Sequence, residues 1–293
     1  MKILSFLQEG RAGLAVQSGP EWLDVSRADP TLPTDVAVLL GDPQWQGRLA
    51  RAAERAPRLD LPTVKFLSPL RAPQKILCVG LNYVDHVAES PYKQQPTYPT
   101  FFPRFASSLI AHEQPMIRPR VSDQLDYEGE LVVVIGRQGR HIGVQRALEH
   151  VAGYTIFNEG SVRDYQFKSP QWSVGKNFDG TGACGPWFVT ADELPPGGKG
   201  LRLTTRVNGR VEQDASTDDM IFDVPTLIAL ASEAMTLLPG DMLVTGTPAG
   251  VGFGKKPQVY LRAGDLCEVE VEGIGVLRNA VADEAVVQEA VPA

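Results

Sequence analysis

Short apolar runs alternate with turn residues along most of the chain, a pattern typical of a β-rich protein. Near the N-terminus the runs ILSFL, GLAVQ and WLDVS are separated by turns at Glu9-Gly10 and Ser18-Gly19, so we expect short strands there. From Lys75 onward further strand-length runs follow, bounded by Gly, Pro or Asp: KILCVGL, ELVVVIG, VAGYTIF, PWFVT, RLTTRVNG, DMLVTG and LCEVEVEGIG. The sequence therefore predicts a mostly β fold.

Two segments carry helical patterns instead. The first, QWQGRLARAAER, runs from about Gln44 to Arg55 and precedes a connector punctuated by proline. In the second, Asp223 can cap a helix that has Pro225 in its first turn and continues through TLIALASEAM to the turn PGD at 239–241. The change of character near residue 70 predicts a small N-terminal domain with a linker over residues 1–70 and a larger domain over residues 71–293.

The charge and the apolar runs of the chain limit the kinds of molecule that it is expected to bind. The 293 residues include 28 Gly and 23 Pro, and the formal net charge is −7 without a basic run, which argues against nucleic acid and against an anionic membrane surface. No apolar run approaches the roughly 20 residues of a membrane span, and the N-terminal one is too brief for a signal peptide. We therefore expect a cytoplasmic protein that binds a small molecule. The widely spaced Cys78, Cys184 and Cys267 predict buried free thiols.

Acidic residues alternate just before one of the apolar runs. In LDYEGELVVVIG, Asp126, Glu128 and Glu130 are two residues apart, so on a strand they would share one face within about 7 Å of each other at each step. Such a face is either a solvated acidic edge or a site where a cation lies among the oxygens. Glu159, after VAGYTIF, is either a turn acid or a ligand from a neighbouring strand. Oxygen ligands favour Mg²⁺, Mn²⁺ or Ca²⁺ over zinc.

A second candidate constellation lies in GLNYVDHVAES. His86 and Glu89 are three residues apart, so on a short helix the carboxylate can bond the imidazole and raise its basicity; the alternative is an exposed histidine with a chance neighbour. Glycine-rich segments also surround Lys176 and Thr247. Neither segment has the spacing of a phosphate loop, so a carboxylate-bearing substrate is the better hypothesis than a nucleotide.

These segments, in this order, resemble the fumarylacetoacetate hydrolase family. The resemblance runs from Pro73 to about Asn279 through GLNYVDHVAES, FFPRFASSLI, LDYEGELVVVIG, GYTIFNEGSVRDYQ, GKNFDGTGACGPWFVT, MIFDVPTLIALAS and PGDMLVTGTPAGVG. It implies an α+β, predominantly β fold: a mixed β-sandwich roll with few helices, preceded by a small N-terminal β-containing domain. It also implies a homodimer.

By the resemblance, Glu128 and Glu130 match the metal-binding ExE pair of the family. Glu159 falls where the third carboxylate stands, although the family usually has Asp there. Asn82 occupies a segment where some members carry a further acidic ligand, so we expect a site of three carboxylates completed by water.

The resemblance assigns the remaining site residues as well. His86 and Glu89 match a catalytic HxxE dyad, and Lys176 would stabilise an oxyanion beside them. The substrate-binding positions are Tyr83, Arg104, Arg163, Gln166 and Thr247, where Arg104 replaces the lysine of many relatives.

The implied activity is metal-dependent hydrolysis of a C–C bond in a 2,4-dioxo acid such as an acylpyruvate, with Mg²⁺ or Mn²⁺ as cofactor and Ca²⁺ as a substitute in a crystal. The same site could serve an isomerase or decarboxylase of 2-oxo or 2-hydroxy-dienoic acids in aromatic-compound catabolism, or an oxaloacetate decarboxylase, because fold does not fix the reaction. The alternative from another class is a non-catalytic binding module stabilised by Ca²⁺.

Overall fold

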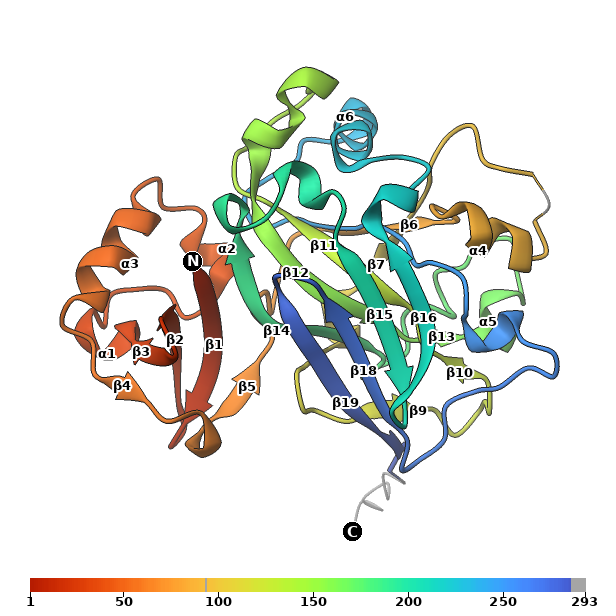
Figure 1. Cartoon of the computed structure of the whole chain (residues 1–293), viewed down its shortest axis with the longest axis horizontal. Helices are drawn as coiled ribbons and strands as arrows, with labels where there is room; N and C mark the ends of the chain where they lie inside the picture. Colours follow the sequence, from red (N-terminus) through yellow and green to blue (C-terminus); the bar gives the residue numbers. More distant parts are fainter. Residues whose placement is uncertain (93, 286–293) are drawn as a thin grey trace, which may run out of the picture.

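The computed structural model describes residues 1–92 and 94–285 of the chain. Strands dominate it, with short helices at the edges (Figure 1). The six α-helices of the described part are α1 Val25–Ala28, α2 Val36–Leu39, α3 Trp45–Ala53, α4 Val84–Glu89, α5 Arg163–Gln166 and α6 Val224–Ala234. None of the helices in the described part is both long and apolar enough to span a bilayer.

The largest sheet of the described part has twelve strands and runs through the centre of the molecule. Its order is β4 (Arg58–Leu59), β3 (Glu21–Asp24), β2 (Arg11–Ser18), β1 (Lys2–Gln8), β14 (Gly182–Thr190), β12 (Val151–Glu159), β11 (Gly129–Ile135), β17 (Met242–Val244), β6 (Ile76–Gly80) and β7 (Thr100–Arg104). Two further strands join it at the side, β5 (Lys65–Leu67) on β1 and β8 (Leu109–Ala111) on β14.

Two smaller sheets complete the fold. The five-stranded sheet has the order β16 (Arg210–Ser216), β15 (Arg202–Val207), β18 (Leu266–Val271), β19 (Gly275–Asp283) and β9 (Met116–Arg118). The two-stranded sheet pairs β10 (Leu125–Asp126) with β13 (Ser161–Val162). The predicted α+β, mostly β architecture with an N-terminal β region is confirmed.

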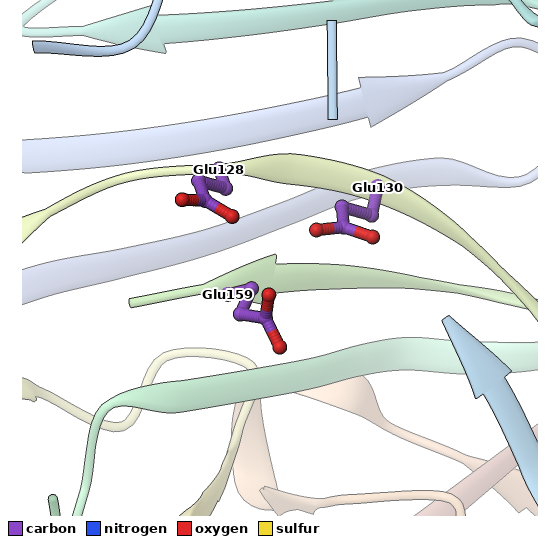
Figure 2. A group of neighbouring side chains, drawn as sticks. All are labelled: Glu128, Glu130 and Glu159. Carbon is purple, nitrogen blue, oxygen red and sulfur yellow. The ribbon is translucent and has the colours of Figure 1, made fainter. Parts of the chain in front are cut away.

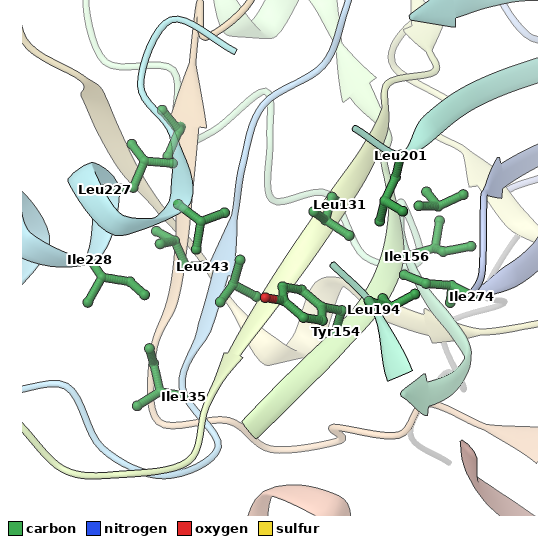
Figure 3. Close-up of a cluster of buried hydrophobic side chains, with 14 of the residues drawn as sticks. Leu131, Ile135, Tyr154, Ile156, Leu194, Leu201, Leu227, Ile228, Leu243 and Ile274 are labelled. Carbon is green, nitrogen blue, oxygen red and sulfur yellow. The ribbon is translucent and has the colours of Figure 1, made fainter. Parts of the chain in front are cut away.

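Strand β11 is buried on both faces, which explains its unbroken apolar run. Leu131, Val133 and Ile135 belong to an apolar cluster that includes residues of α6 and the five-stranded sheet (Figure 3). Val132 and Val134 belong to a second cluster, shared with residues of the N-terminal region such as Leu49 of α3. Because alternate residues of a strand point to opposite faces, a central strand covered on both sides carries no polar alternation.

The five-stranded sheet approaches β11 closely at Gly129. A Cβ at this position would lie 2.2 Å from Thr205 Oγ1 and 2.9 Å from a methyl group of Val269. Only glycine permits this approach, and it brings the strands that cover β11 directly over the residues that precede its apolar run.

The predicted local elements are largely present. Asp223 caps α6 by accepting from Thr226 N at 3.0 Å, and the first predicted helix is α3. Two boundaries differ. WLDVS leaves the extended conformation at Val25, because Asp24 caps α1 by accepting from Arg27 N. Helix α6 stops at Ala234, before the expected turn at residues 239–241.

The N-terminal strands do not form a separate sheet. β1 pairs antiparallel with β14 through Lys2↔Val189 and Ile3↔Phe188, so the sheet runs unbroken from the N-terminal region on the left of Figure 1 into the centre of the molecule. A domain boundary near residue 70 stays a prediction. The three cysteines are buried and free, as expected.

Candidate active site

Three buried glutamates converge on one point of the central sheet (Figure 2). Glu130 lies in β11, Glu128 directly precedes that strand, and Glu159 ends the neighbouring β12. The antiparallel register places Glu130 opposite Phe157, and Glu159 N donates to Glu128 O at 2.8 Å. One carboxylate oxygen from each glutamate lies within 4.8 Å of those of the other two. The pairing of β11 with β12 therefore builds the cluster.

Positive side chains compensate part of the charge of this cluster. Lys176 Nζ donates to Glu128 Oε2 and to Glu159 Oε2, each at 2.8 Å. Burial opposes ionisation of Glu128, but the charges of Lys176 and Arg163 outweigh burial and lower the pKa of Glu128 to about 2. Burial also opposes the charge of Lys176, and the two glutamates nevertheless raise its pKa. Glu128 and Lys176 are thus a buried ion pair.

The negative charge of Glu130 is offset less well by positive groups than that of Glu128. Burial, followed by the charges of Glu159 and Glu128, raises the pKa of Glu130 well above the usual carboxyl range. Its hydrogen bond comes from the backbone: Gly246 N donates to Glu130 Oε2 at 2.5 Å. Gly246 has a φ of +99°, a left-handed conformation that favours glycine. The glycine-rich segment around Thr247 therefore brings a backbone N–H group to the carboxylate of Glu130.

The cluster fits a hard divalent cation. Glu159 Oε1 is buried and has no hydrogen-bond partner, an arrangement that is costly unless another group binds the oxygen. All three ligands offer carboxylate oxygen, which Mg²⁺, Mn²⁺ and Ca²⁺ prefer. Glu128, Glu130 and Glu159 would hold such an ion.

The His86–Glu89 pair forms on α4, as the spacing predicts. His86 Nδ1 lies 2.8 Å from Glu89 Oε1, and the side chains are only 12% and 18% exposed. Gly250 N donates to the other carboxylate oxygen, Glu89 Oε2, at 3.0 Å. Because a carboxylate accepts only, it fixes the Nδ1–H tautomer and leaves Nε2 of His86 as the basic nitrogen.

One narrow cavity joins the dyad to the cluster. Its volume is about 40 Å³, enough for only a few water molecules. Aromatic side chains supply much of its apolar wall, namely Tyr92, Phe167, Trp172 and Phe253. The predicted site residues that line it are His86, Glu89, Glu128, Glu159, Arg163, Gln166, Lys176 and Thr247.

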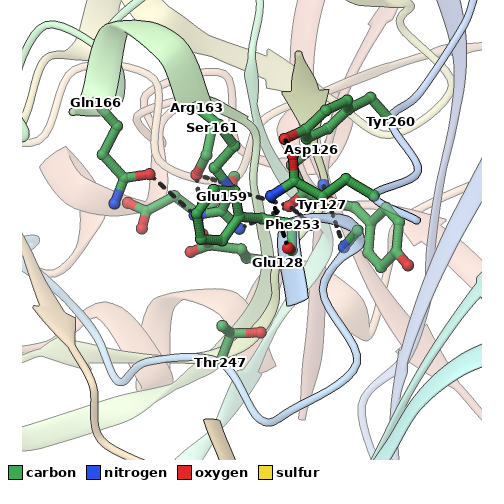
Figure 4. A network of polar contacts seen from close by, with 12 residues as sticks. Asp126, Tyr127, Glu128, Glu159, Ser161, Arg163, Gln166, Thr247, Phe253 and Tyr260 are labelled. Carbon is green, nitrogen blue, oxygen red and sulfur yellow. Dashed lines mark hydrogen bonds and ion pairs between the residues drawn. The ribbon is translucent and has the colours of Figure 1, made fainter. Parts of the chain in front are cut away.

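Three of these lining residues are held by other protein groups, and Figure 4 shows the contacts of two of them, Arg163 and Gln166. Arg163 Nη1 lies 2.6 Å from Glu128 Oε1 and donates to Gln166 Oε1 at 2.9 Å. Since the carbonyl oxygen of Gln166 is engaged by a cation, its NH₂ group remains available as a donor. Thr247 Oγ1 donates to Gly129 O at 2.9 Å. Gln166 is thus the lining residue best prepared to bind a substrate oxygen.

Two predicted substrate-binding residues are not brought to the cavity. Arg104 is fully buried and donates to Ser108 Oγ, Gly160 O and Thr181 Oγ1, at 3.0, 3.2 and 2.6 Å. Its Nη1 lies 3.6 Å from Glu159 Oε1. Arg104 therefore adds positive charge next to the cluster without lining the cavity. Tyr83 is 1% exposed and lines a different depression of the surface.

The side-chain amide of Asn82 is fully hydrogen-bonded to main-chain groups. This agrees with the expectation that three carboxylates, and not Asn82, supply the protein ligands. Its Nδ2 donates to Phe222 O and Thr245 O at 3.0 and 2.7 Å, and its Oδ1 accepts from Phe222 N at 2.8 Å. Both ends of the amide are therefore occupied.

The expectation that Asp126 shares a face with the two glutamates is wrong. Asp126 ends the short strand β10, and residues 127 and 128 separate it from β11, so the alternation of a single strand does not apply. Its carboxylate instead binds Arg163 and two backbone N–H groups of the loop at residues 252 and 253.

Sequence reasoning missed two residues that support the site. Gln213 of β16 accepts from Gly129 N at 3.0 Å and donates to Thr247 Oγ1 at 2.8 Å. Ser161 Oγ donates to Glu128 Oε1 at 3.0 Å. Gln213 lies outside the segments that the sequence singled out, and it reaches the site from another sheet. Ser161 lies two residues after Glu159, but its spacing alone did not indicate a contact with Glu128.

The comparison with known proteins agrees with this geometry. The family described as fumarylacetoacetate (FAA) hydrolase C-terminal matches residues 75–282. This match covers more than half of the chain, and the chain therefore belongs to the fumarylacetoacetate hydrolase family. The N-terminal strands β1–β5 precede the matched region.

Similar proteins carry several different activities in their names. A human mitochondrial oxaloacetate tautomerase is 40% identical over 273 residues, which is 92% of this chain and 86% of that protein. A solved fumarylacetoacetate hydrolase from Exiguobacterium antarcticum is 38% identical with a TM-score of 0.84, covering 97% of this chain and 100% of that one. The chain is thus similar to enzymes of more than one reaction class.

Two further solved structures extend this range. A 2-hydroxyhepta-2,4-diene-1,7-dioate isomerase from Mycobacterium marinum is 30% identical, with a TM-score of 0.78 and coverage of 98% and 100%. A maleylpyruvate hydrolase from Sphingobium sp. SYK-6, in complex with manganese(II) and pyruvate, is 27% identical, with a TM-score of 0.80 and coverage of 97% and 100%. The fold is shared with these structures, whereas the activities in their names differ.

Proposed function

We propose that the protein is a divalent-metal-dependent tautomerase of oxaloacetate or a closely similar small 2-oxo dicarboxylic acid. The observation that carries the proposal is the single narrow cavity shared by the His86–Glu89 pair and the glutamate cluster. The dyad and the carboxylates of Glu128 and Glu159 line this one cavity, and a similar human protein that is named for this activity aligns with 92% of the chain. Mg²⁺ or Mn²⁺ is the proposed metal.

The reaction moves one proton from oxygen to carbon. In the enol form the 2-oxygen carries a proton and a double bond joins carbons 2 and 3; in the keto form that oxygen has lost its proton and carbon 3 has gained one. A bound divalent cation stabilises negative charge on the 2-oxygen as a Lewis acid. His86, oriented by Glu89, would take the proton from the 2-oxygen on Nε2 and deliver it to carbon 3, and the reverse reaction would return it by the same two steps.

Other residues bind and orient the acid. The free NH₂ group of Gln166 donates to a substrate carboxylate, since its oxygen already accepts from Arg163. Lys176 lines the cavity and offsets part of the negative charge of Glu128 and Glu159, which reduces their repulsion of a bound acid. The aromatic wall excludes water, which strengthens these interactions.

Hydrolysis of a C–C bond in an acylpyruvate-like 2,4-dioxo acid is the second candidate. Its support is the same histidine–carboxylate pair, which can activate a water molecule, and the similarity to solved proteins named as hydrolases. It differs from the first candidate in releasing pyruvate or another 2-oxo acid.

The test dilutes enol-oxaloacetate into buffer with Mg²⁺ and follows loss of the enol ultraviolet absorbance, while pyruvate release is measured separately. We expect faster loss of enol without pyruvate, dependent on the metal and reduced at least a hundredfold in His86→Ala. Asp85→Asn, an exposed neighbour on α4, is the control and should retain activity. Pyruvate release from acylpyruvates without enol decay would favour the second candidate, and inactivity in both assays would exclude both.

A further inference from the structure

The buried carboxylate of Asp126 lies beside the site and accepts several hydrogen bonds (Figure 4). Its Oδ1 accepts from Tyr127 N at 2.9 Å and from Gly252 N at 2.8 Å. Its Oδ2 accepts from Phe253 N and from Arg163 Nε, both at 2.9 Å. Asp126 is 0% exposed, and all four partners donate to its two carboxylate oxygens.

The loop that Asp126 holds also contacts the dyad. Gly250, two residues before the first of these amides, donates its N–H to Glu89 Oε2 at 3.0 Å, and its carbonyl accepts from Tyr127 Oη at 3.0 Å. The other oxygen of Glu89 binds His86 at 2.8 Å. The loop of residues 250–253 is therefore fixed to the dyad at one end and to Asp126 at the other.

The opposite side of Asp126 leads to the metal cluster. The guanidinium of Arg163 lies against Asp126 Oδ2, with Nη2 2.8 Å away, and its Nη1 lies 2.6 Å from Glu128 Oε1. Both side chains of this buried pair are less than 5% exposed. An unbroken series of contacts thus runs from His86 through the loop and Asp126 to Glu128.

We infer that Asp126 is a positioning residue that fixes the His86–Glu89 dyad relative to the metal-binding carboxylate Glu128, through the loop of residues 250–253 on one side and Arg163 on the other. The inference deepens the proposed function, on which its catalytic part rests. The physical reason is geometric: proton transfer at a bound acid requires base and metal at a set separation, and small misplacements reduce the rate strongly.

Two variants interrupt the series at different points. Asp126→Asn keeps the size of the side chain but replaces one acceptor oxygen by a donor, which opposes the N–H groups around it. Tyr127→Phe removes the hydroxyl that holds Gly250 O and leaves Asp126 and Arg163 unchanged. Asp24→Asn is the matched control, because Asp24 is also buried, binds Arg11 and caps a helix, but lies in the N-terminal region.

The first measurement needs no substrate. Hydrogen–deuterium exchange of the folded protein is followed at residues 250–254 and at α4 in each variant. We expect Asp126→Asn to speed exchange at least tenfold in both segments, and Asp24→Asn to leave both within twofold of the parent. Unchanged exchange at α4 in Asp126→Asn would overturn the inference, since the dyad helix would then be fixed independently.

The second measurement is turnover at saturating metal and substrate. We expect Asp126→Asn to lower kcat at least tenfold and Tyr127→Phe about threefold, with KM changed less than kcat. The double variant should be no slower than about twofold below Asp126→Asn, because both changes release the same loop. Multiplicative losses, or a kcat in Asp126→Asn equal to that of Asp24→Asn, would contradict the inference.

The two measurements separate this inference from the proposed function. If the parent protein has no activity on any of the tested acids, the proposed function fails, while exchange at α4 still decides whether Asp126 positions the dyad. If the parent is active and exchange at α4 does not respond, the function stands and the positioning role is excluded.

Discussion

At the scale of single residues, the site is defined by incomplete charge compensation. Lys176 bridges two of the three glutamates, whereas Glu130 has its hydrogen bond from a backbone amide and keeps a raised pKa because of burial and the charges of its two neighbours. A carboxyl whose pKa is raised by folding binds its proton more tightly in the folded protein. Folding stability then falls as pH rises above the ordinary carboxyl range.

We therefore predict that Glu130→Gln stabilises the metal-free protein while it abolishes metal binding. The amide oxygen can still accept from Gly246 N, but the buried negative charge is gone. At pH 8 and without metal, the melting temperature should rise by roughly 2 °C or more; the parent should lose stability between pH 5.5 and pH 8 and the variant should not. Added Mn²⁺ should raise the melting temperature of the parent only. Calorimetry with and without Mn²⁺ checks this, and equal metal stabilisation of both proteins would contradict it.

At the scale of elements, strand pairing and one loop conformation position the ligands. The register of β11 with β12 brings Glu159 to Glu128 and Glu130, and the loop after β17 delivers the Gly246 amide to Glu130. A Cβ on Gly246 would lie 2.8 Å from Asn82 Cβ and 2.9 Å from Val79 O. The loop conformation and the close packing beneath it both depend on glycine.

Gly246→Ala should accordingly cost more than an alanine at a free turn. Strain at a positive φ and overpacking together should lower the free energy of unfolding by roughly 2 to 4 kcal/mol, and the displaced amide should weaken Mn²⁺ binding about tenfold. The control is Gly209→Ala in the β15–β16 turn, with a φ of +77° and nothing within 4 Å of the added Cβ. It should lose only roughly 1 to 2 kcal/mol and keep its metal affinity; equal losses in urea denaturation would refute the packing argument.

At the scale of the whole molecule, the N-terminal region and the centre share one sheet and one apolar cluster. Ile3, Leu14 and Leu49 of the N-terminal region belong to the same cluster as Val132 and Met242 of the central strands. Removal of the first 70 residues would uncover that cluster and the β14 edge against which β1 pairs. Whether the predicted boundary near residue 70 separates two independently folding units therefore depends on how much of the stability comes from this shared cluster.

Thermal unfolding should therefore occur in one transition. Because the N-terminal strands and the central sheet share one buried apolar cluster, unfolding of either part exposes apolar surface of the other. Scanning calorimetry of the full chain should give one peak, and a chain that starts at residue 71 should be unfolded or aggregated. Two separate peaks, or a soluble folded fragment, would instead support an autonomous N-terminal domain.

The local pattern of the sequence determined the strands, the capped helix α6, the spacing of His86 and Glu89, and the candidate acids. These features depend on neighbours in the chain: period-two alternation, an N-cap aspartate, or a helical separation of three residues. For Glu159 the sequence pattern left open a turn acid or a ligand from a neighbouring strand, and the family resemblance favoured the ligand.

Only the tertiary structure decided which of those residues meet. It separated Asp126 from the three-glutamate cluster because residues 127 and 128 interrupt the strand, and it placed Arg104 against Glu159 and outside the cavity. It also brought Gln213 to Thr247 from a different sheet. The physical reason is common to all three: spacing along the chain fixes a side chain's direction within one element, whereas its partners depend on how separate elements pack.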